Sequence, residues 1–338
     1  MQYRMLGKTG LNVSAIGFGG IPIQRITAEE TAKLFPILME HGVNYIDSAR
    51  GYTVSEEFIG AALTQHHCRD KFILATKSMS RSYDDMARDI DISLHNFNTE
   101  TIDLYQLHNI KTDADFALAF SDKGAVAAIE DAIKAGKIGH LGATAHSADS
   151  FKKLLTYPQI ETIMFPYNIV ERQGEALMAQ AKAQNVGVIA MKPLAGGNLT
   201  NGTLAMRYIL QNENCTLAIP GMAAAAEILQ NTAAAEDIAP LSDAEQAEIE
   251  QTRKDLTGNF CRRCGYCAPC TVGIDIPTCF TMESYLRNYG LADWAKSRYA
   301  TFAAKASACI ACGECEKRCP YDLPIREKLK QVAAAFGA

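Results

Sequence analysis

The chain has 338 residues, of which 48% are hydrophobic and 21% charged, the composition of a globular protein with a sizeable core and room for two domains. Its net charge is −5 and it has no long run of lysine or arginine, so nothing points to a nucleic-acid or membrane partner. The sequence has neither the apolar segment of a signal peptide nor an 18-residue apolar stretch, and we expect a cytoplasmic location.

Short apolar runs alternate with longer helical patterns from about residue 13 to residue 235. Continuous runs rich in Val, Ile and Leu are typical of parallel strands that are buried on both faces. Eight β–α units in roughly 220 residues predict a (β/α)₈ barrel rather than a doubly wound sheet. The runs end near Gly19, Asp47, Lys77, His108, Thr144, Pro166, Met191 and Pro220.

Capping signals mark two helix starts. Thr27 and Glu30 have capping-box spacing before the first barrel helix, and Ser242 and Glu245 have the same spacing before a helix predicted over 242–256. These capping signals and the start of the cysteine groups divide the chain into a barrel (1–240), a connecting helix (241–258) and a cysteine-rich domain (259–338). Within the last domain, one long helical stretch is predicted over 284–305.

Eight of the eleven cysteines form two tight groups near the C-terminus. Disulfide scaffolds are short secreted chains, whereas this chain is long and has no export signal, so the groups favour metal or cluster ligation. The first group is Cys261, Cys264, Cys267 and Cys270, and the second is Cys309, Cys312, Cys315 and Cys319 followed by Pro320.

The second group has the spacing of bacterial two-cluster ferredoxins, in which the fourth cysteine binds the other cluster. We therefore predict a small α+β ferredoxin-like domain with two [4Fe–4S] clusters. Zinc is the alternative, but it usually takes two C-x₂-C pairs that are farther apart. Because Thr271 replaces the proline after the first group, Cys279 is an alternative to Cys270. The predicted ligand sets are Cys261, Cys264, Cys267 and Cys319 for one cluster, and Cys270, Cys309, Cys312 and Cys315 for the other.

Titratable side chains stand where three successive barrel strands should end. Asp47, Lys77 and His108 end the second, third and fourth predicted strands, and Tyr52 lies in the loop after the second. Singly, these residues could be a helix cap, a lysine reaching for solvent and a core histidine. Active sites of (β/α)₈ enzymes lie at the C-terminal ends of the strands, so together they predict a catalytic site.

The barrel sequence resembles the aldo-keto reductase family. The resemblance covers LGKTGLNVSAIGFGG, GVNYIDSARGY, ATK, IDLYQLHN, PYN, PLAGG and the IPG…E…N segment that ends at Asn231. The subgroup that it resembles carries a C-terminal ferredoxin-like domain with two [4Fe–4S] clusters. The resemblance implies a nicotinamide-dependent oxidoreductase that acts on a small carbonyl or alcohol, with a catalytic tetrad of Asp47, Tyr52, Lys77 and His108.

The tetrad has a clear physical logic. A free phenol titrates near pH 10, so Tyr52 is a poor proton donor near neutrality. A buried Lys77 ammonium would lower the pKa of Tyr52, and Asp47 would keep the lysine charged. His108 would orient the substrate oxygen, while hydride comes from the cofactor.

The nicotinamide contacts implied by the family are altered. Ala145, Met164 and Met191 replace the asparagine, glutamine and aromatic residue that usually hold the nicotinamide. Glu227 replaces an arginine, and since a carboxylate can accept from a ribose 2′-OH, we expect NAD(H) rather than NADP(H). The residues expected to bind the cofactor are Thr144, His146, Met191, Lys192, Pro193, Leu194, Gly221, Glu227 and Asn231.

The sequence leaves the role of the clusters open. Hydride transfer moves two electrons and a cluster takes one, so direct coupling would need a flavin, for which there is no signature. The clusters could exchange electrons with a ferredoxin-type partner or stabilise the domain. Two alternatives remain: an electron-transfer or binding protein without nicotinamide chemistry, and a lyase or isomerase that uses the same tetrad.

Overall fold

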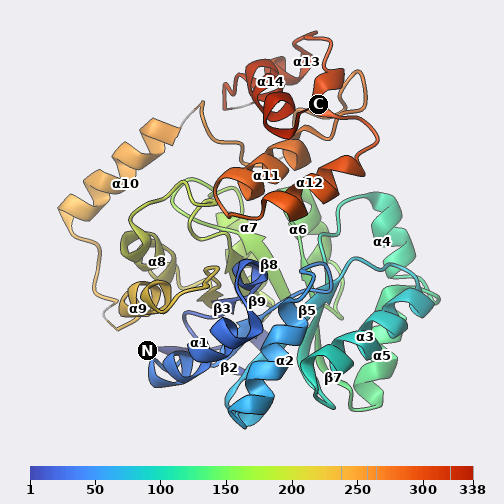
Figure 1. Cartoon of the computed structure of the whole chain (residues 1–338), viewed down its shortest axis with the longest axis vertical. Helices are drawn as coiled ribbons and strands as arrows, with labels where there is room; N and C mark the ends of the chain where they lie inside the picture. The colour runs from blue at the N-terminus through green and yellow to red at the C-terminus, as the bar shows by residue number, and fades with distance from the viewer. Residues whose placement is uncertain (237, 257, 264, 320, 338) are drawn as a thin grey trace. The chain divides into compact units, whose positions relative to one another are not determined.

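A computed structural model describes residues 1–236, 238–256, 258–263, 265–319 and 321–337, which form two compact units (Figure 1). The second unit contains, besides the C-terminal part of the chain, two short segments from the loops after two barrel strands. The first unit comprises Met1–Asn168, Arg172–Leu194 and Asn201–Leu241, and the second comprises Ile169–Glu171, Ala195–Thr200 and Ser242–Ala338.

The first unit is built around an eight-stranded parallel sheet in the order β10-β9-β8-β7-β6-β5-β4-β3. Parallel bridges from Ile16 to Ala218 and from Gly19 to Gly221 join the two edges, so the sheet closes and the predicted (β/α)₈ barrel is confirmed. The strands are β3 (Phe18–Gly19), β4 (Tyr45–Asp47), β5 (Ile73–Ser78), β6 (Ile102–Leu107), β7 (Ile138–Thr144), β8 (Thr162–Pro166), β9 (Gly187–Met191) and β10 (Leu217–Ala218).

Apolar side chains fill the barrel interior, with Tyr45, Leu104, Met164 and Ile189 almost completely buried in one cluster. The strands end within two residues of the predicted positions, because each apolar run stops where the chain leaves the barrel. A short antiparallel hairpin of β1 (Tyr3–Met5) and β2 (Asn12–Ser14) precedes the sheet.

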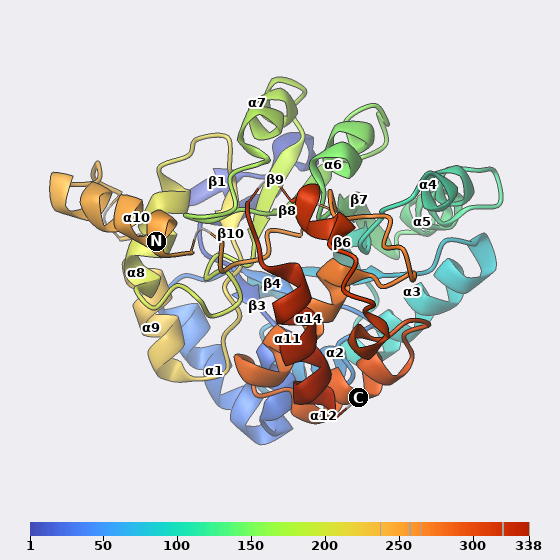
Figure 2. The ribbon, with the colours of Figure 1, turned by 90° about the horizontal axis from the view of Figure 1, so that it is seen from above.

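Helices surround the strands of the first unit (Figure 2). Helix α1 begins with the predicted capping box, since Glu30 N–H donates to Thr27 Oγ1 at 3.1 Å and Thr27 N–H donates to Glu30 Oε2 at 2.8 Å. The helices are α1 (Ala28–Glu40), α2 (Ser55–Gln65), α3 (Tyr83–Phe97), α4 (Asp113–Ala119), α5 (Ala125–Lys134), α6 (Ala148–Leu154), α7 (Glu175–Ala183), α8 (Gly202–Leu210) and α9 (Ala225–Ala233), with 3₁₀ turns at η1 (Gly7–Thr9), η2 (Ile21–Arg25) and η3 (Arg69–Lys71).

The second unit is helical in its described residues, and no strand is assigned among them. The prediction of one helical stretch over 284–305 is wrong, because the chain turns between α11 and α12 at Gly290, whose φ of +64° interrupts a helix. The elements are α10 (Asp243–Leu256), α11 (Ile276–Arg287), α12 (Ala292–Ala300), η4 (Ala306–Ala308), α13 (Glu314–Lys317) and α14 (Ile325–Phe336).

Helices α11 and α14 contribute the core of this second unit, which includes Ile276, Phe280, Leu329 and Val332. Several cysteines of both groups pack at the edge of this core. No helix among the described residues is long and apolar enough to cross a membrane.

Candidate functional site

The ends of β4, β5 and β6 bring together the four residues predicted to be catalytic. Lys77 Nζ donates to Asp47 Oδ2 at 2.5 Å and lies 5.1 Å from the centre of the Tyr52 ring. The rings of Tyr52 and His108 are 6.0 Å apart at an interplanar angle of 90°. Residues that are up to 61 positions apart therefore form one cluster at the C-terminal ends of the strands.

Asp47 and Lys77 form a buried ion pair, with side-chain exposures of 4% and 2%. Burial raises the pKa of the Asp47 carboxyl, while Lys77 and the amide of Gln106 oppose the rise. Burial likewise lowers the pKa of the Lys77 ammonium, against the pull of Asp47. Each charge is therefore maintained by its partner, and Lys77 also donates to Ser48 O at 2.7 Å.

Tyr52 and His108 are more accessible than the ion pair, since both are only partly buried. The loop that carries Tyr52 is a tight turn, in which Tyr52 N–H donates to Ala49 O and Ser55 N–H donates to Tyr52 O. The phenol and the imidazole are thus the more solvent-accessible members of the cluster, and the ion pair is its buried part. This arrangement can deliver a proton to a bound substrate oxygen.

Asn109, which the sequence analysis did not single out, links two of the predicted cofactor residues. Its backbone N–H donates to Thr144 Oγ1 at 2.7 Å, and its side-chain Oδ1 is 3.0 Å from His146 Nδ1. The sequence feature that could have identified Asn109 is its position directly after His108 in the LHN motif. The ends of β6 and β7 are therefore tied together next to the candidate catalytic cluster.

The altered nicotinamide positions lie directly after β7, within β8 and at the end of β9. Ala145 and Met164 are buried, and Met191 is 9% exposed within the same apolar cluster as Met164. Lys192 has a φ of +55°, and its carbonyl accepts from Asn168 Nδ2 at 2.9 Å. Of the next two predicted cofactor residues, Pro193 is buried and Leu194 is partly exposed.

At the end of β10, two predicted cofactor residues are placed on α9. Glu227 Oε2 accepts from the N–H groups of Ala223 and Ala224 at 2.6 and 3.0 Å, and Glu227 Oε1 is 3.4 Å from Arg25 Nη2. Asn231 is 3% exposed, and among the described residues its Oδ1 has no hydrogen-bond donor. Arg25 is a cation that sequence reasoning missed, because it comes from η2 at the other end of the barrel sequence. Gly221, the third residue, forms the bridge to Gly19 that closes the sheet.

Cysteines of both groups line a first cavity in the second unit. Cys261, Cys267 and Cys319 contribute to its wall, together with apolar side chains that include Phe260 and Phe280. Cys264, the remaining predicted ligand, lies outside the described residues. The structure thus places the last cysteine of the second group beside the first group, as the ferredoxin-type spacing requires.

A second cavity has the reciprocal composition, with three cysteines of the second group and one of the first. The cysteines that line it are the four of the second predicted set: Cys270, Cys309, Cys312 and Cys315. Cys279 lines neither cavity; it is completely buried, and burial raises the pKa of its thiol to about 12. This geometry favours Cys270 over Cys279 as a ligand.

The spacing of these thiols suits a cube better than a single ion. Among the described residues no three His, Cys, Asp or Glu side chains are close enough to surround one metal ion. In a [4Fe–4S] cluster each thiolate binds a different iron, so the four sulfurs stand around a cavity rather than at a point. Four thiols line the second cavity in this way, and three of the described thiols line the first.

Comparison with known proteins identifies the families of the barrel and of the cysteine-rich domain. Residues 15–203 match the Aldo/keto reductase family, and residues 260–324 match a 4Fe-4S dicluster domain. The chain therefore belongs to the aldo/keto reductase family and is an oxidoreductase with a dicluster iron–sulfur domain.

Several relatives carry related names. The aldo-keto reductase YhdN of Bacillus subtilis is 27% identical over 232 residues, which cover 63% of this chain and 68% of the relative. An L-galactose dehydrogenase of Arabidopsis thaliana is 24% identical over 290 residues, covering 71% and 90%. The holo form of an aldo-keto reductase from Bacillus halodurans superposes with a TM-score of 0.63 at 25% identity, over 75% of this chain and 96% of that one.

Proposed function

We propose that the protein is a nicotinamide-dependent reductase of small carbonyl compounds, or a dehydrogenase of the corresponding alcohols, in which Tyr52 exchanges the proton. The observation that carries this proposal is the convergence of Tyr52, Lys77 and His108 at the mouth of the barrel, with Lys77 Nζ 5.1 Å from the phenol ring. Family membership supports the reaction class, and the local geometry supports the assignment of roles.

Each side chain has one task in this mechanism. The imidazole of His108 hydrogen-bonds the substrate oxygen and fixes its direction. Tyr52 gives its phenolic proton to that oxygen during reduction and takes it back during oxidation. The Lys77 ammonium stabilises the phenolate that remains, and Asp47 holds that ammonium in its charged form.

The residues at the ends of β7, β9 and β10 would hold the nicotinamide cofactor, which supplies or accepts hydride when bound. One observation supports the fit at the adenosine end: the buried Asn231 Oδ1, which has no donor among the described residues, could accept from the amino group of adenine. The Lys192 ammonium could form an ion pair with a phosphate of the cofactor. A carboxylate at Glu227 favours the free 2′-hydroxyl of NAD(H), although Arg25 beside it offers a positive charge to a 2′-phosphate.

The two cysteine-lined cavities would hold the [4Fe–4S] clusters, which supply one-electron transfer or structural stability to the domain. Arg318 supports the fit, because its Nη2 donates to the carbonyls of Cys267 and Pro269 at 3.1 and 2.7 Å and so ties the two groups together. Cys312 is exposed, which would leave the second cluster accessible to a ferredoxin-type partner.

Tyr52→Phe tests the proposal. Removing the proton donor should lower kcat by about 10²–10⁴-fold with little change in nucleotide affinity, since the ring and its packing are kept. Tyr83→Phe is the matched control, because Tyr83 lies at the start of α3 and its hydroxyl donates to Asp131 at the surface, away from the candidate site. Equal turnover by the Tyr52 variant and the wild type would rule out the assigned role.

A second candidate, an iron–sulfur electron-transfer protein without nicotinamide chemistry, rests on a different observation. Ala145, Met164 and Met191 offer no side-chain hydrogen bond to a carboxamide, and Met164 and Met191 pack into the apolar interior of the barrel. Failure of both NADH and NADPH to bind would favour this candidate. Nucleotide binding with a turnover that depends on Tyr52 would favour the reductase.

A further inference from the structure

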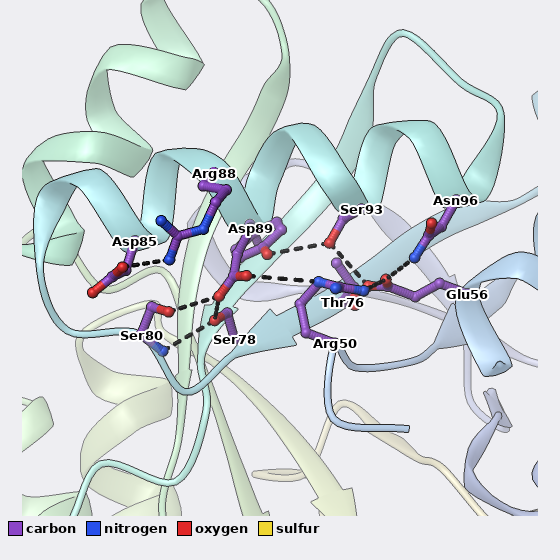
Figure 3. A network of polar contacts seen from close by, with 11 residues as sticks. Arg50, Glu56, Thr76, Ser78, Ser80, Asp85, Arg88, Asp89, Ser93 and Asn96 are labelled. Carbon is purple, nitrogen blue, oxygen red and sulfur yellow. Dashed lines mark hydrogen bonds and ion pairs between the residues drawn. The ribbon is translucent and has the colours of Figure 1, made fainter. Parts of the chain in front are cut away.

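A network of buried and partly buried polar groups includes Arg50, two residues before Tyr52 (Figure 3). Arg50 is at its centre: its Nη1 donates to Glu56 Oε2 at 2.7 Å, and its Nε lies 3.8 Å from Asp89 Oδ1. The backbone N–H of Arg50 donates to Lys77 O at 3.0 Å. One residue thus connects the loop of the candidate proton donor to the strand of the candidate catalytic lysine.

Glu56 is the first anchor of this network. It stands in the first turn of α2, and its side chain is only 1% exposed. Besides Arg50, its carboxylate accepts from Thr76 Oγ1 on β5 at 2.7 Å, and from Ser93 Oγ and Asn96 Nδ2 on α3 at 2.9 and 3.1 Å. A buried carboxylate is costly unless it is paired and hydrogen-bonded, so this site depends on the guanidinium of Arg50.

Asp89 is the second anchor, on α3. Its Oδ2 accepts from the hydroxyl of Ser80 at 2.6 Å and from the hydroxyl of Ser78, the last residue of β5. The guanidinium is a rigid planar fork, and carboxylates on two sides fix its orientation more firmly than one would. Figure 3 shows Arg50 between Glu56 and Asp89, with the serines and Thr76 grouped around the two carboxylates.

This geometry ties the loop to the barrel at the level of the reacting groups. Thr76 and Ser78 flank Lys77 on β5, and each donates to one of the two carboxylates that hold Arg50. Two peptide units separate Arg50 from Tyr52. A displacement of Arg50 therefore moves the phenol relative to the ammonium that stabilises it.

We propose that Arg50 is a positioning residue for Tyr52: held between Glu56 and Asp89, it fixes the loop that carries the phenol against the strand that carries Lys77. The inference rests on the proposed role of Tyr52 as proton donor. Arg50 contributes no atom to the reaction, and its effect passes through the position of the phenol.

The test compares Arg50→Met and Arg50→Lys with Arg88→Met in the intact protein. Arg88 is on the same helix as Asp89, its side chain is 64% exposed, and among the described residues its ion pair is with Asp85, so its substitution removes the same charge without removing a contact of Arg50. The readouts are kcat and KM for the reduction of 4-nitrobenzaldehyde, the Kd of NADH and NADPH by fluorescence, and the melting temperature.

Arg50→Met should lower kcat by about 100-fold while KM and nucleotide Kd change less than threefold, because a misplacement of roughly 1 Å affects the reaction and not the binding. Arg50→Lys should restore part of the loss, to about tenfold below wild type, since an ammonium can pair with one carboxylate but lacks the planar fork. Arg88→Met should behave as the wild type.

Two results would overturn the inference. One is a folded Arg50→Met variant with wild-type kcat. The other is general damage to both Arg50 variants, seen as failure to fold or as a fall in kcat together with a rise in KM and a loss of nucleotide affinity, which would assign Arg50 to the stability of the barrel. If instead Tyr52→Phe keeps wild-type turnover, the proposed function itself fails, so the two failures are distinguishable.

Discussion

The two candidate sites of this protein are encoded in opposite ways. In the barrel, Asp47, Lys77 and His108 are about 30 positions apart at the ends of three strands, and Tyr52 lies in the loop after the first of them, whereas the cysteines of the iron–sulfur domain are spaced by two or three residues within each group. In the barrel the fold brings the groups together, and the burial of Asp47 and Lys77 is part of the chemistry. In the cysteine domain the local spacing supplies three ligands of each predicted set, and the fourth comes from the other group. The barrel site should therefore be sensitive to changes in its supporting structure, and the cluster sites to the loss of single ligands.

The largest effect is expected from Lys77→Met, which leaves the buried Asp47 without its partner. We expect the free energy of unfolding to fall by about 3–5 kcal/mol and turnover to be lost. The double variant Asp47→Asn/Lys77→Met should recover much of the stability but not the activity, because no uncompensated charge remains. Denaturant unfolding of the single and double variants measures this. Equal stability of the wild type and the two variants would show that the charges of Asp47 and Lys77 are too accessible to solvent for the loss of one to destabilise the fold.

The cluster ligands provide the next test. Cys319→Ala should remove the cluster of the first cavity and Cys270→Ala that of the second, each lowering the iron content to about half that of the wild type. Cys279→Ala is the matched control, since this thiol is buried outside both cavities. Iron analysis and visible absorbance of protein prepared without oxygen give the readout. A loss of iron in the Cys279 variant alone would reverse the assignment of Cys270.

A smaller effect should follow from Glu227→Gln, which removes the carboxylate charge beside Arg25 but keeps an oxygen that can accept from Ala223 and Ala224. Without the negative charge of Glu227, Arg25 would attract a 2′-phosphate more strongly, and the preference for NADH over NADPH should shift by about tenfold toward NADPH. The ratio of kcat/KM for the two nucleotides is the measurement. An NADPH preference already present in the wild type would contradict the assignment of NAD(H).

The smallest effect is expected at a helix cap. Thr27→Ala removes the side chain that accepts from Glu30 N–H and should lower the stability of the barrel by about 1 kcal/mol. The visible absorbance of the clusters should be unchanged in the folded protein. Thermal unfolding followed by circular dichroism and by cluster absorbance separates the two units, and a simultaneous shift of both signals would show that they unfold together.

Much of the architecture was predictable because the barrel repeats one simple pattern. Asp47, Thr144, Pro166 and Met191 are both the predicted and the observed last residues of their strands, since buried parallel strands give continuous apolar runs. The break between α11 and α12 was missed, because Gly290 is a weak signal within a sequence of otherwise helical character. Arg25, Arg50 and Asn109 were missed for another reason: their partners Glu227, Glu56 and His146 become neighbours only in the folded chain.

The most direct test of the central claim is a titration of oxygen-free protein with NADH and NADPH, in which nucleotide fluorescence and cluster absorbance are followed together. The proposed function predicts saturable binding of at least one nucleotide, tighter for NADH, followed by oxidation of the bound nucleotide when a small aldehyde is added. Bleaching of the cluster absorbance would further show that the clusters receive electrons from the nucleotide. Failure of both nucleotides to bind would contradict the proposed reductase, because the tetrad would then have no source of hydride.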